Sequence, residues 1–150
     1  MQNRGDSMQY PNYRVAVEIV IIHELKILLT KRADDREGGS GAWSVPSGKV
    51  KYEEVPIQAL HREALEETNL EIELLTELDV RAIQSIGQDG EFYRLMFTYL
   101  VRPRNDDITP LIINEEHSAF AWVTAEELDD EKYQSVHDNL KAILKNLFSK

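Results

Sequence analysis

The segment GKVKYEEVPIQALHREALEETNL, residues 48–70, decides the fold of this chain. It starts at Gly48, where a loop rich in Gly, Asp and Ser ends, and continues into apolar residues at helical spacing. Pro56 suits the first turn of a helix, because the N–H that proline lacks has no intrahelical partner there. Asn69 suits the left-handed conformation that often ends a helix. We therefore predict a helix from Pro56 to about Thr68.

One face of this predicted helix is acidic. At roughly 100° per residue, Glu63, Glu66 and Glu67 fall within one arc beside the apolar face. Carboxylates at this spacing repel one another, so a folded cluster favours a bound cation, and hard oxygen ligands select magnesium, manganese or calcium. The alternatives are a solvated helix face, which is the commoner meaning of a run of glutamates, and a calcium-binding structural helix.

The residues around the acidic face favour a site over a solvated surface. A loop ending in Gly48 precedes the helix, and Arg62 is spaced to pair with Glu54 at the helix entrance. Such an ion pair would hold the loop and the helix in register.

Gly48, Glu54 and the run REALEETNL (62–70) together resemble the Nudix box, a 23-residue signature of hydrolases that act on nucleoside diphosphate-linked compounds. All charged positions of that signature are present at the correct spacing. Among its fixed positions only Asn69 departs, where the family usually has glycine, and asparagine also tolerates a left-handed conformation. Ser47, Lys51 and Glu53 also differ from the residues that many family members have at these less strictly fixed positions.

The resemblance implies a metal site on the helix. Glu63, Glu66 and Glu67 would hold Mg²⁺, for which Mn²⁺ could substitute, and the backbone carbonyl of Ser47 would be a further ligand. Phosphoanhydride hydrolysis needs such ions, because neighbouring phosphates repel hydroxide and gain charge as the bond breaks.

The resemblance also implies roles for residues beyond the metal ligands. Glu54 and Arg62 would orient the site. The general base differs among family members, so Glu66, which we favour, competes with Glu115 and Glu116 on a later loop.

Substrate contacts are less specific in the sequence. Gly48 would let the backbone approach the phosphates closely. Lys49, Arg32 and Arg36 are candidates for phosphate contact, although solvated surface positions would have the same composition. We interpret the four histidines, including His117, as surface or structural, because they have no metal-ligand spacing.

The flanking segments predict a sheet. RVAVEIVII (14–22) and LKILLTKR (25–32) read as a hairpin with a turn at His23-Glu24. Residues 71–85 and 91–102 predict a second antiparallel pair around the turn signal Asp89-Gly90, and a further strand is expected over 119–123. Residues 33–48 and 102–116 read as loops.

The tail predicts a helix that packs on this sheet. Thr124 and Glu127 form a capping-box pattern, and apolar residues at helical spacing run from Val136 to Leu147. The order of elements indicates an α/β fold with a mixed sheet covered by helices. The resemblance, which extends at lower specificity from about Arg14, implies a Nudix-type α/β/α sandwich.

Length and charge limit the class of protein. The 150 residues suit one domain, which we expect over 14–150 after a flexible arm over 1–13. The chain has no cysteine, no membrane-spanning apolar run and no signal-peptide pattern, so we expect a cytoplasmic protein. A net charge of -10 disfavours long nucleic acids, whereas a small anionic substrate remains compatible with a bound cation.

The expected function is metal-dependent hydrolysis of a phosphoanhydride bond in a small nucleotide, with a MutT-like nucleoside triphosphate pyrophosphohydrolase favoured by the compact length. ADP-ribose or nucleotide-sugar hydrolysis is the alternative within the family. A Nudix-fold module that senses nucleotides without turnover is the alternative from another class, and a homodimer is compatible with the sequence.

Overall fold

The computed structural model describes residues 13–34, 41–87 and 90–149 of the chain. Residues 1–12 of the predicted N-terminal arm, Arg36 with most of its loop, and Asp89 of the predicted tight turn lie outside these ranges, whereas Tyr13, which the arm was expected to include, is the first residue of a strand.

Strand β1 (Tyr13–His23) lies at the centre of the sheet. It pairs antiparallel with β2 (Lys26–Arg32) and with β4 (Ser47–Lys49), and parallel with β6 (Gly90–Pro103). The predicted hairpin is confirmed, but its turn is shifted by one residue. Glu24 and Leu25 occupy it with φ of 50° and 63°, the left-handed values of the tight turns that join antiparallel strands.

The remaining strands complete a mixed sheet, as the sequence predicts. β5 (Ile72–Gly87) pairs antiparallel with β6, and β2 pairs antiparallel with β3 (Trp43–Ser44) and β7 (His117–Val123). The seven strands found in the described residues follow the order β3-β2-β1-β6-β5, with β4 beside β1 and β7 beside β2. The prediction of an unbroken loop over 33–48 is wrong at β3 and β4, whose few residues are too short to show a strand periodicity.

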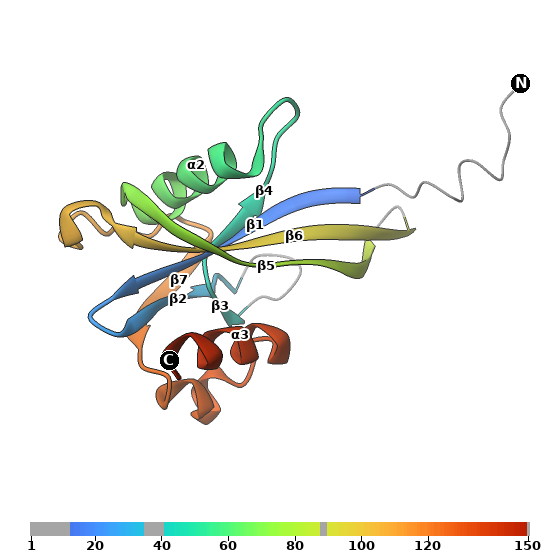
Figure 1. Cartoon of the computed structure of the whole chain (residues 1–150). Coiled ribbons are helices and arrows are strands. Elements are labelled where there is room, and N and C mark those ends of the chain that lie inside the picture. The colour runs from blue at the N-terminus through green and yellow to red at the C-terminus, as the bar shows by residue number, and fades with distance from the viewer. Residues whose placement is uncertain (1–12, 35–40, 88–89, 150) are drawn as a thin grey trace, which may run out of the picture.

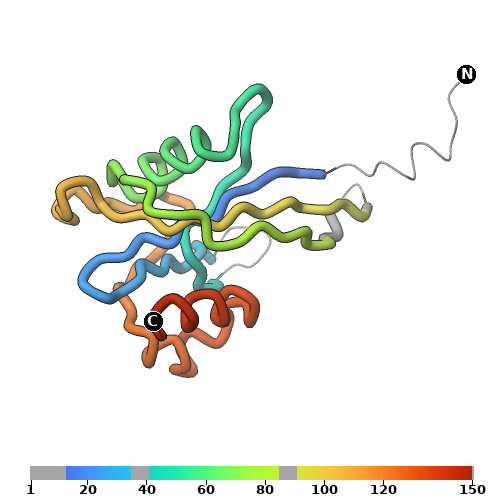
Figure 2. Tube along the Cα trace, in the orientation of Figure 1, coloured from blue at the N-terminus to red at the C-terminus, as the bar shows by residue number. Residues whose placement is uncertain are grey.

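Helices cover both faces of the sheet (Figure 1, Figure 2). Helix α2 (Pro56–Thr68) has the predicted bounds and lies on one face, and α3 (Asp138–Phe148) lies on the other. Alternate residues of β1 fill the two cores, since Ile19 packs with α2 and Val20 packs with α3. Burial on both faces explains why β1 is a nearly continuous apolar run, and the α/β/α sandwich is confirmed.

The C-terminal helix begins later than its capping signal indicates. Thr124 and Glu127 do form the reciprocal bonds of a capping box, at 3.1 and 3.2 Å, but the box caps the 3₁₀ turn η2 (Glu127–Asp129). A second turn, η3 (Glu131–Tyr133), follows before α3. Within the described residues, neither helix has the length and apolar character needed to cross a membrane.

Asn69 ends α2 as predicted, with φ of 61°, and its Nδ2 donates to the Pro110 carbonyl at 2.9 Å. We expect Asn69→Ala to lower the free energy of unfolding by about 1–2 kcal/mol, because a Cβ disfavours this backbone conformation. Asn69→Gly should stay within about 1 kcal/mol of the parent, since relief of backbone strain offsets the lost bond. Urea unfolding of the three proteins measures this, and equal losses in both variants would contradict it.

Candidate active site

The Arg62 guanidinium connects the loop after β4 to helix α2. Its Nε and Nη2 donate to the two oxygens of Glu54 at 2.7 and 2.8 Å, and Nη2 also donates to the Lys49 carbonyl at 2.9 Å. Its Nη1 donates to Glu63 at 2.8 Å and to Glu66 at 3.0 Å. These bonds use all five N–H groups of the side chain. The ion pair expected between Arg62 and Glu54 is therefore present.

Hydrogen bonds from Arg62 stabilise the charged form of Glu54. Together with the Lys51 N–H, which donates to Glu54 at 3.0 Å, they lower the pKa of that carboxyl to about 2. The same contacts raise the pKa of Arg62 above its already high value. Loop and helix are thus joined by a pair that stays ionised throughout the neutral range.

Glu67 is in the opposite situation. The residue is only 2% exposed, and its Oε2 atom has no hydrogen-bond partner among the described residues. Burial raises the pKa of this carboxyl well above its ordinary value, and the nearby Glu63 and Glu116 raise it further. Without a cation, Glu67 is therefore held as the neutral acid.

Gly48 makes room for Glu63. A Cβ built at residue 48 would overlap the Cγ, Cδ and Oε2 atoms of the Glu63 side chain. Gly48 is held in this position because β4 pairs with β1, where it lies opposite Val17. The absence of a side chain at Gly48 thus has a structural reason in addition to the backbone approach expected from the sequence.

The loop before β7 brings a histidine to the acidic helix. His117 Nε2 lies 3.6 Å from Glu67 Oε1, and His117 Nδ1 lies 3.2 Å from Asn114 Oδ1. Burial lowers the pKa of His117. Of the two expectations for this residue, surface or structural, its burial favours the second. The loop before His117 hydrogen-bonds to the last turn of α2, where the Asn114 N–H donates to the Glu67 carbonyl at 3.3 Å, and spacing along the chain does not reveal this contact. Of the two candidate glutamates on this loop, Glu115 is exposed and Glu116 is partly buried near Glu67.

The acidic face of α2 is not a preformed metal cluster. Among the residues that the structure describes, no three carboxylate or imidazole side chains converge on one point suited to a metal ion. Glu63 and Glu66 turn toward Arg62, whereas Glu67 is directed into the protein interior. Carboxylate oxygens are nevertheless the ligands that Mg²⁺ and Mn²⁺ prefer, and the unpartnered oxygen of Glu67 is chemically suited to one.

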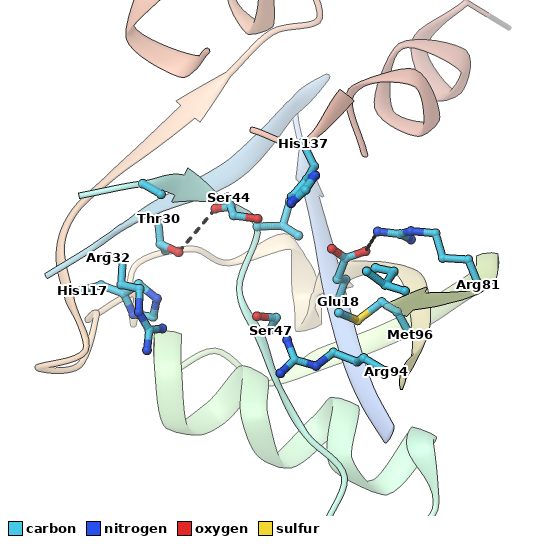
Figure 3. A pocket seen from close by; sticks show the side chains of 13 residues that line it. Glu18, Thr30, Arg32, Ser44, Ser47, Arg81, Arg94, Met96, His117 and His137 are labelled. Atoms are coloured by element: carbon cyan, nitrogen blue, oxygen red, sulfur yellow. Dashed lines mark hydrogen bonds and ion pairs between the residues drawn. The ribbon is translucent and has the colours of Figure 1, made fainter. Parts of the chain in front are cut away.

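A cavity of about 310 Å³ lies beside this region. Ser47 and His117 line it, together with residues from β1, β2, β3, β5 and β6 and with His137, which precedes α3 (Figure 3). Arg94 extends toward Ser47, and Arg32 lies next to His117 (Figure 3). Arg32 thus lines the cavity, as a candidate for substrate contact should, whereas Lys49 is not among the lining residues.

Glu18, Arg81 and Arg94 line the cavity and were not predicted as site residues. Glu18 Oε1 accepts from Thr98 Oγ1 at 2.7 Å and from Arg81 Nη2 at 3.0 Å. The one signal for this group in the sequence is the charge of Glu18 within the apolar run RVAVEIVII. The three chain segments involved lie far apart in sequence, so the pairing itself could not be found there.

The raised pKa of Glu67 predicts that the free energy of unfolding depends on pH. An unfolded glutamate titrates near 4.5, whereas the folded pKa is raised, so above pH 4.5 the folded metal-free protein holds a proton that the unfolded chain has lost. Its free energy of unfolding should therefore fall as pH rises from about 5 toward the folded pKa. Glu67→Gln, which mimics the neutral acid, should flatten this slope in urea titrations with EDTA. The same slope in both proteins would be evidence against a buried neutral Glu67.

The packing of Gly48 against Glu63 predicts an energetic coupling. Gly48→Ala should displace the Glu63 side chain and lower the free energy of unfolding by about 1–2 kcal/mol. In a Glu63→Ala background the overlapping atoms are gone, so the same change should cost almost nothing. A double-mutant cycle measured by chemical unfolding gives the coupling, and a cost that is equal in both backgrounds would rule out this contact as its cause.

Comparison with known proteins agrees with this geometry. The family model for the NUDIX domain matches residues 12–144. Nucleoside triphosphatase NudI of Escherichia coli is 35% identical over 109 residues, which cover 67% of this chain and 74% of that protein.

Solved structures show the same fold. A MutT protein from Methanosarcina mazei superposes with a TM-score of 0.74 at 18% identity, covering 93% of this chain and 95% of that one. A MutT NUDIX hydrolase from Burkholderia pseudomallei gives 0.70 at 26% identity, covering 89% and 97%. The matched domain agrees with the helix and the preceding loop described above. This chain therefore belongs to the Nudix family and is a Nudix hydrolase.

Proposed function

We propose that this protein is a metal-dependent pyrophosphohydrolase that converts nucleoside triphosphates to nucleoside monophosphates and pyrophosphate. The observation that carries the proposal is Glu67, a buried carboxyl on the acidic face of α2 whose Oε2 has no partner in the described residues. A buried carboxyl in this state costs stability unless a proton or a cation compensates it. A metal ion bound at Glu67 would compensate this cost, and it would lie next to a cavity that suits a nucleoside.

The donor set fits magnesium or manganese. Glu67 would hold the metal with Glu63, Glu66 and the Ser47 carbonyl, which are all oxygen donors. Bound there, the metal supplies positive charge at the phosphate oxygens and lowers the pKa of water. To hold it, Glu63 and Glu66 would turn from Arg62, whose hydrogen bonds to Glu54 do not involve these two side chains.

The chain's other residues orient the reaction. Arg62 and Glu54 fix the loop against the helix, so that ligands from both segments keep their spacing. Glu66 is the general base we favour, because half of its side chain is exposed and it can take a proton from water, with Glu115 and Glu116 as alternatives. Arg94 and Arg32 contribute positive charge on the cavity side for the phosphates.

Nucleoside triphosphates are the favoured substrate class for two reasons. The relative at 35% identity is named a nucleoside triphosphatase. In addition, the cavity of about 310 Å³ is at the small end of ligand pockets, which suits one nucleoside better than the two large groups of a dinucleotide or a nucleotide sugar.

A substrate panel tests the proposal. Each nucleoside triphosphate, with ADP-ribose and a nucleotide sugar as comparators, is incubated with Mg²⁺ or Mn²⁺, and pyrophosphate and monophosphate are quantified by ion-exchange chromatography. We expect turnover of triphosphates that EDTA abolishes. Glu67→Gln should lower kcat/KM by about a hundredfold or more, because a lost ligand should cost at least as much as a lost residue supporting one.

Two controls separate loss of metal from loss of fold. Mg²⁺ should raise the unfolding temperature of the parent protein and leave that of Glu67→Gln unchanged. Glu126→Gln, at an exposed position before η2 that does not line the cavity, should keep the parent rate. Equal turnover by the parent and Glu67→Gln, or no metal-dependent turnover of any compound in the panel, would refute the proposal.

A further inference from the structure

We propose that Glu18 makes the cavity selective for nucleotides whose base carries an exocyclic amino group. The inference rests on the proposed function, since it takes the phosphates to lie at α2 and the base to lie deeper in the cavity. It adds a substrate preference, which the family membership does not supply.

Glu18 is fixed in one orientation. The residue is 7% exposed, and its Oε1 atom accepts from Thr98 Oγ1 and Arg81 Nη2. Arg81 is in turn held by Asp79 Oδ2 and Thr98 Oγ1, both at 3.1 Å. The carboxylate of β1 is thus held by residues of β5 and β6, and its rotation would break two hydrogen bonds.

The second oxygen of Glu18 is an unused acceptor. Oε2 has no hydrogen-bond partner among the described residues, and unlike Glu67 Oε2 it is not sealed from solvent. Because Glu18 lines the cavity, a ligand there meets this oxygen (Figure 3). A carboxylate oxygen accepts hydrogen bonds and donates none. It therefore stabilises a base that presents an N–H group and repels one that presents a carbonyl oxygen.

The position of Glu18 suits a base whose phosphates lie at α2. Glu18 lies opposite Ser47 in the β1–β4 ladder, and Ser47 precedes Gly48, against which Glu63 packs. Ser47 and His117, whose Nε2 lies 3.6 Å from Glu67 Oε1, line the same cavity as Glu18. Arg94 extends toward Ser47, whereas Arg81 pairs with Glu18 (Figure 3), so a cation lies near the loop that leads into α2 and the unused oxygen of Glu18 lies in the same cavity.

Matched pairs of substrates isolate this contact. Guanine and hypoxanthine differ only by one amino group, so this pair tests the contact directly. Cytosine carries an amino group where uracil carries a carbonyl oxygen, and the neighbouring ring nitrogen is an acceptor in cytosine and an N–H donor in uracil, so the second pair tests the contact together with that ring nitrogen. We expect the parent protein to prefer CTP over UTP and GTP over ITP by about tenfold or more in kcat/KM, the size expected for a hydrogen bond to a charged group.

Glu18→Gln provides the matched variant. The amide keeps the size and can accept from Arg81 or Thr98, and it can also donate to a carbonyl, so the preference for CTP over UTP should fall toward unity. Glu18→Asp keeps the charge but withdraws it by one methylene, and it should lower the same ratio if the Gln variant fails to fold. Glu126→Gln should retain the parent ratio.

A binding measurement makes the test independent of turnover. Calorimetric titration with CMP and UMP should show the same preference in the parent protein and its loss in Glu18→Gln. Ratios near one in the parent for both pairs, or a preference that persists in both Glu18 variants, would overturn the inference. Selective binding of CMP without hydrolysis of any triphosphate would refute the proposed function and leave the role of Glu18 standing.

Discussion

Strand β1 is the constraint on which both halves of the site depend. It pairs with β2, β4 and β6, so it fixes the loop that leads into α2 and the strands that close the cavity. Its alternate side chains fill two cores, with Ile19 on the α2 side and Val20 on the α3 side. Glu18, on the same face of β1 as Val20, lines the cavity, where Thr98 and Arg81 hold its carboxylate.

The site combines carboxylates in opposite electrostatic states. Glu54 is kept charged by Arg62, whereas burial favours the neutral form of Glu67. The first arrangement stabilises the loop and helix whatever is bound, and the second is costly in the absence of a positive charge. This difference follows from environment alone, because both are glutamates of the same 23-residue segment.

The sequence predicted most of the fold, since the signals involved are local. Pro56 and Asn69 bound α2 as expected, and the two antiparallel pairs have the periodicity of strands. It failed for β3 and β4, which are too short to show a period, and for the start of α3, where a valid capping box at Thr124 serves a short turn. In the site, it identified the residues of the loop and helix because they are close in sequence.

The sequence by itself determined the acidic face of α2, because fixed spacing on one helix sets which side chains are neighbours. It also indicated the family and the pairing of Arg62 with Glu54, because the signature and this pair lie within one short segment of loop and helix. Only the tertiary structure decided that Glu67 is buried without a partner for Oε2 in the described chain, that His117 lies beside it, and that Glu18 meets Arg81 across 63 positions of sequence. Burial and long-range pairing depend on how the sheet is assembled, and no local pattern contains that information.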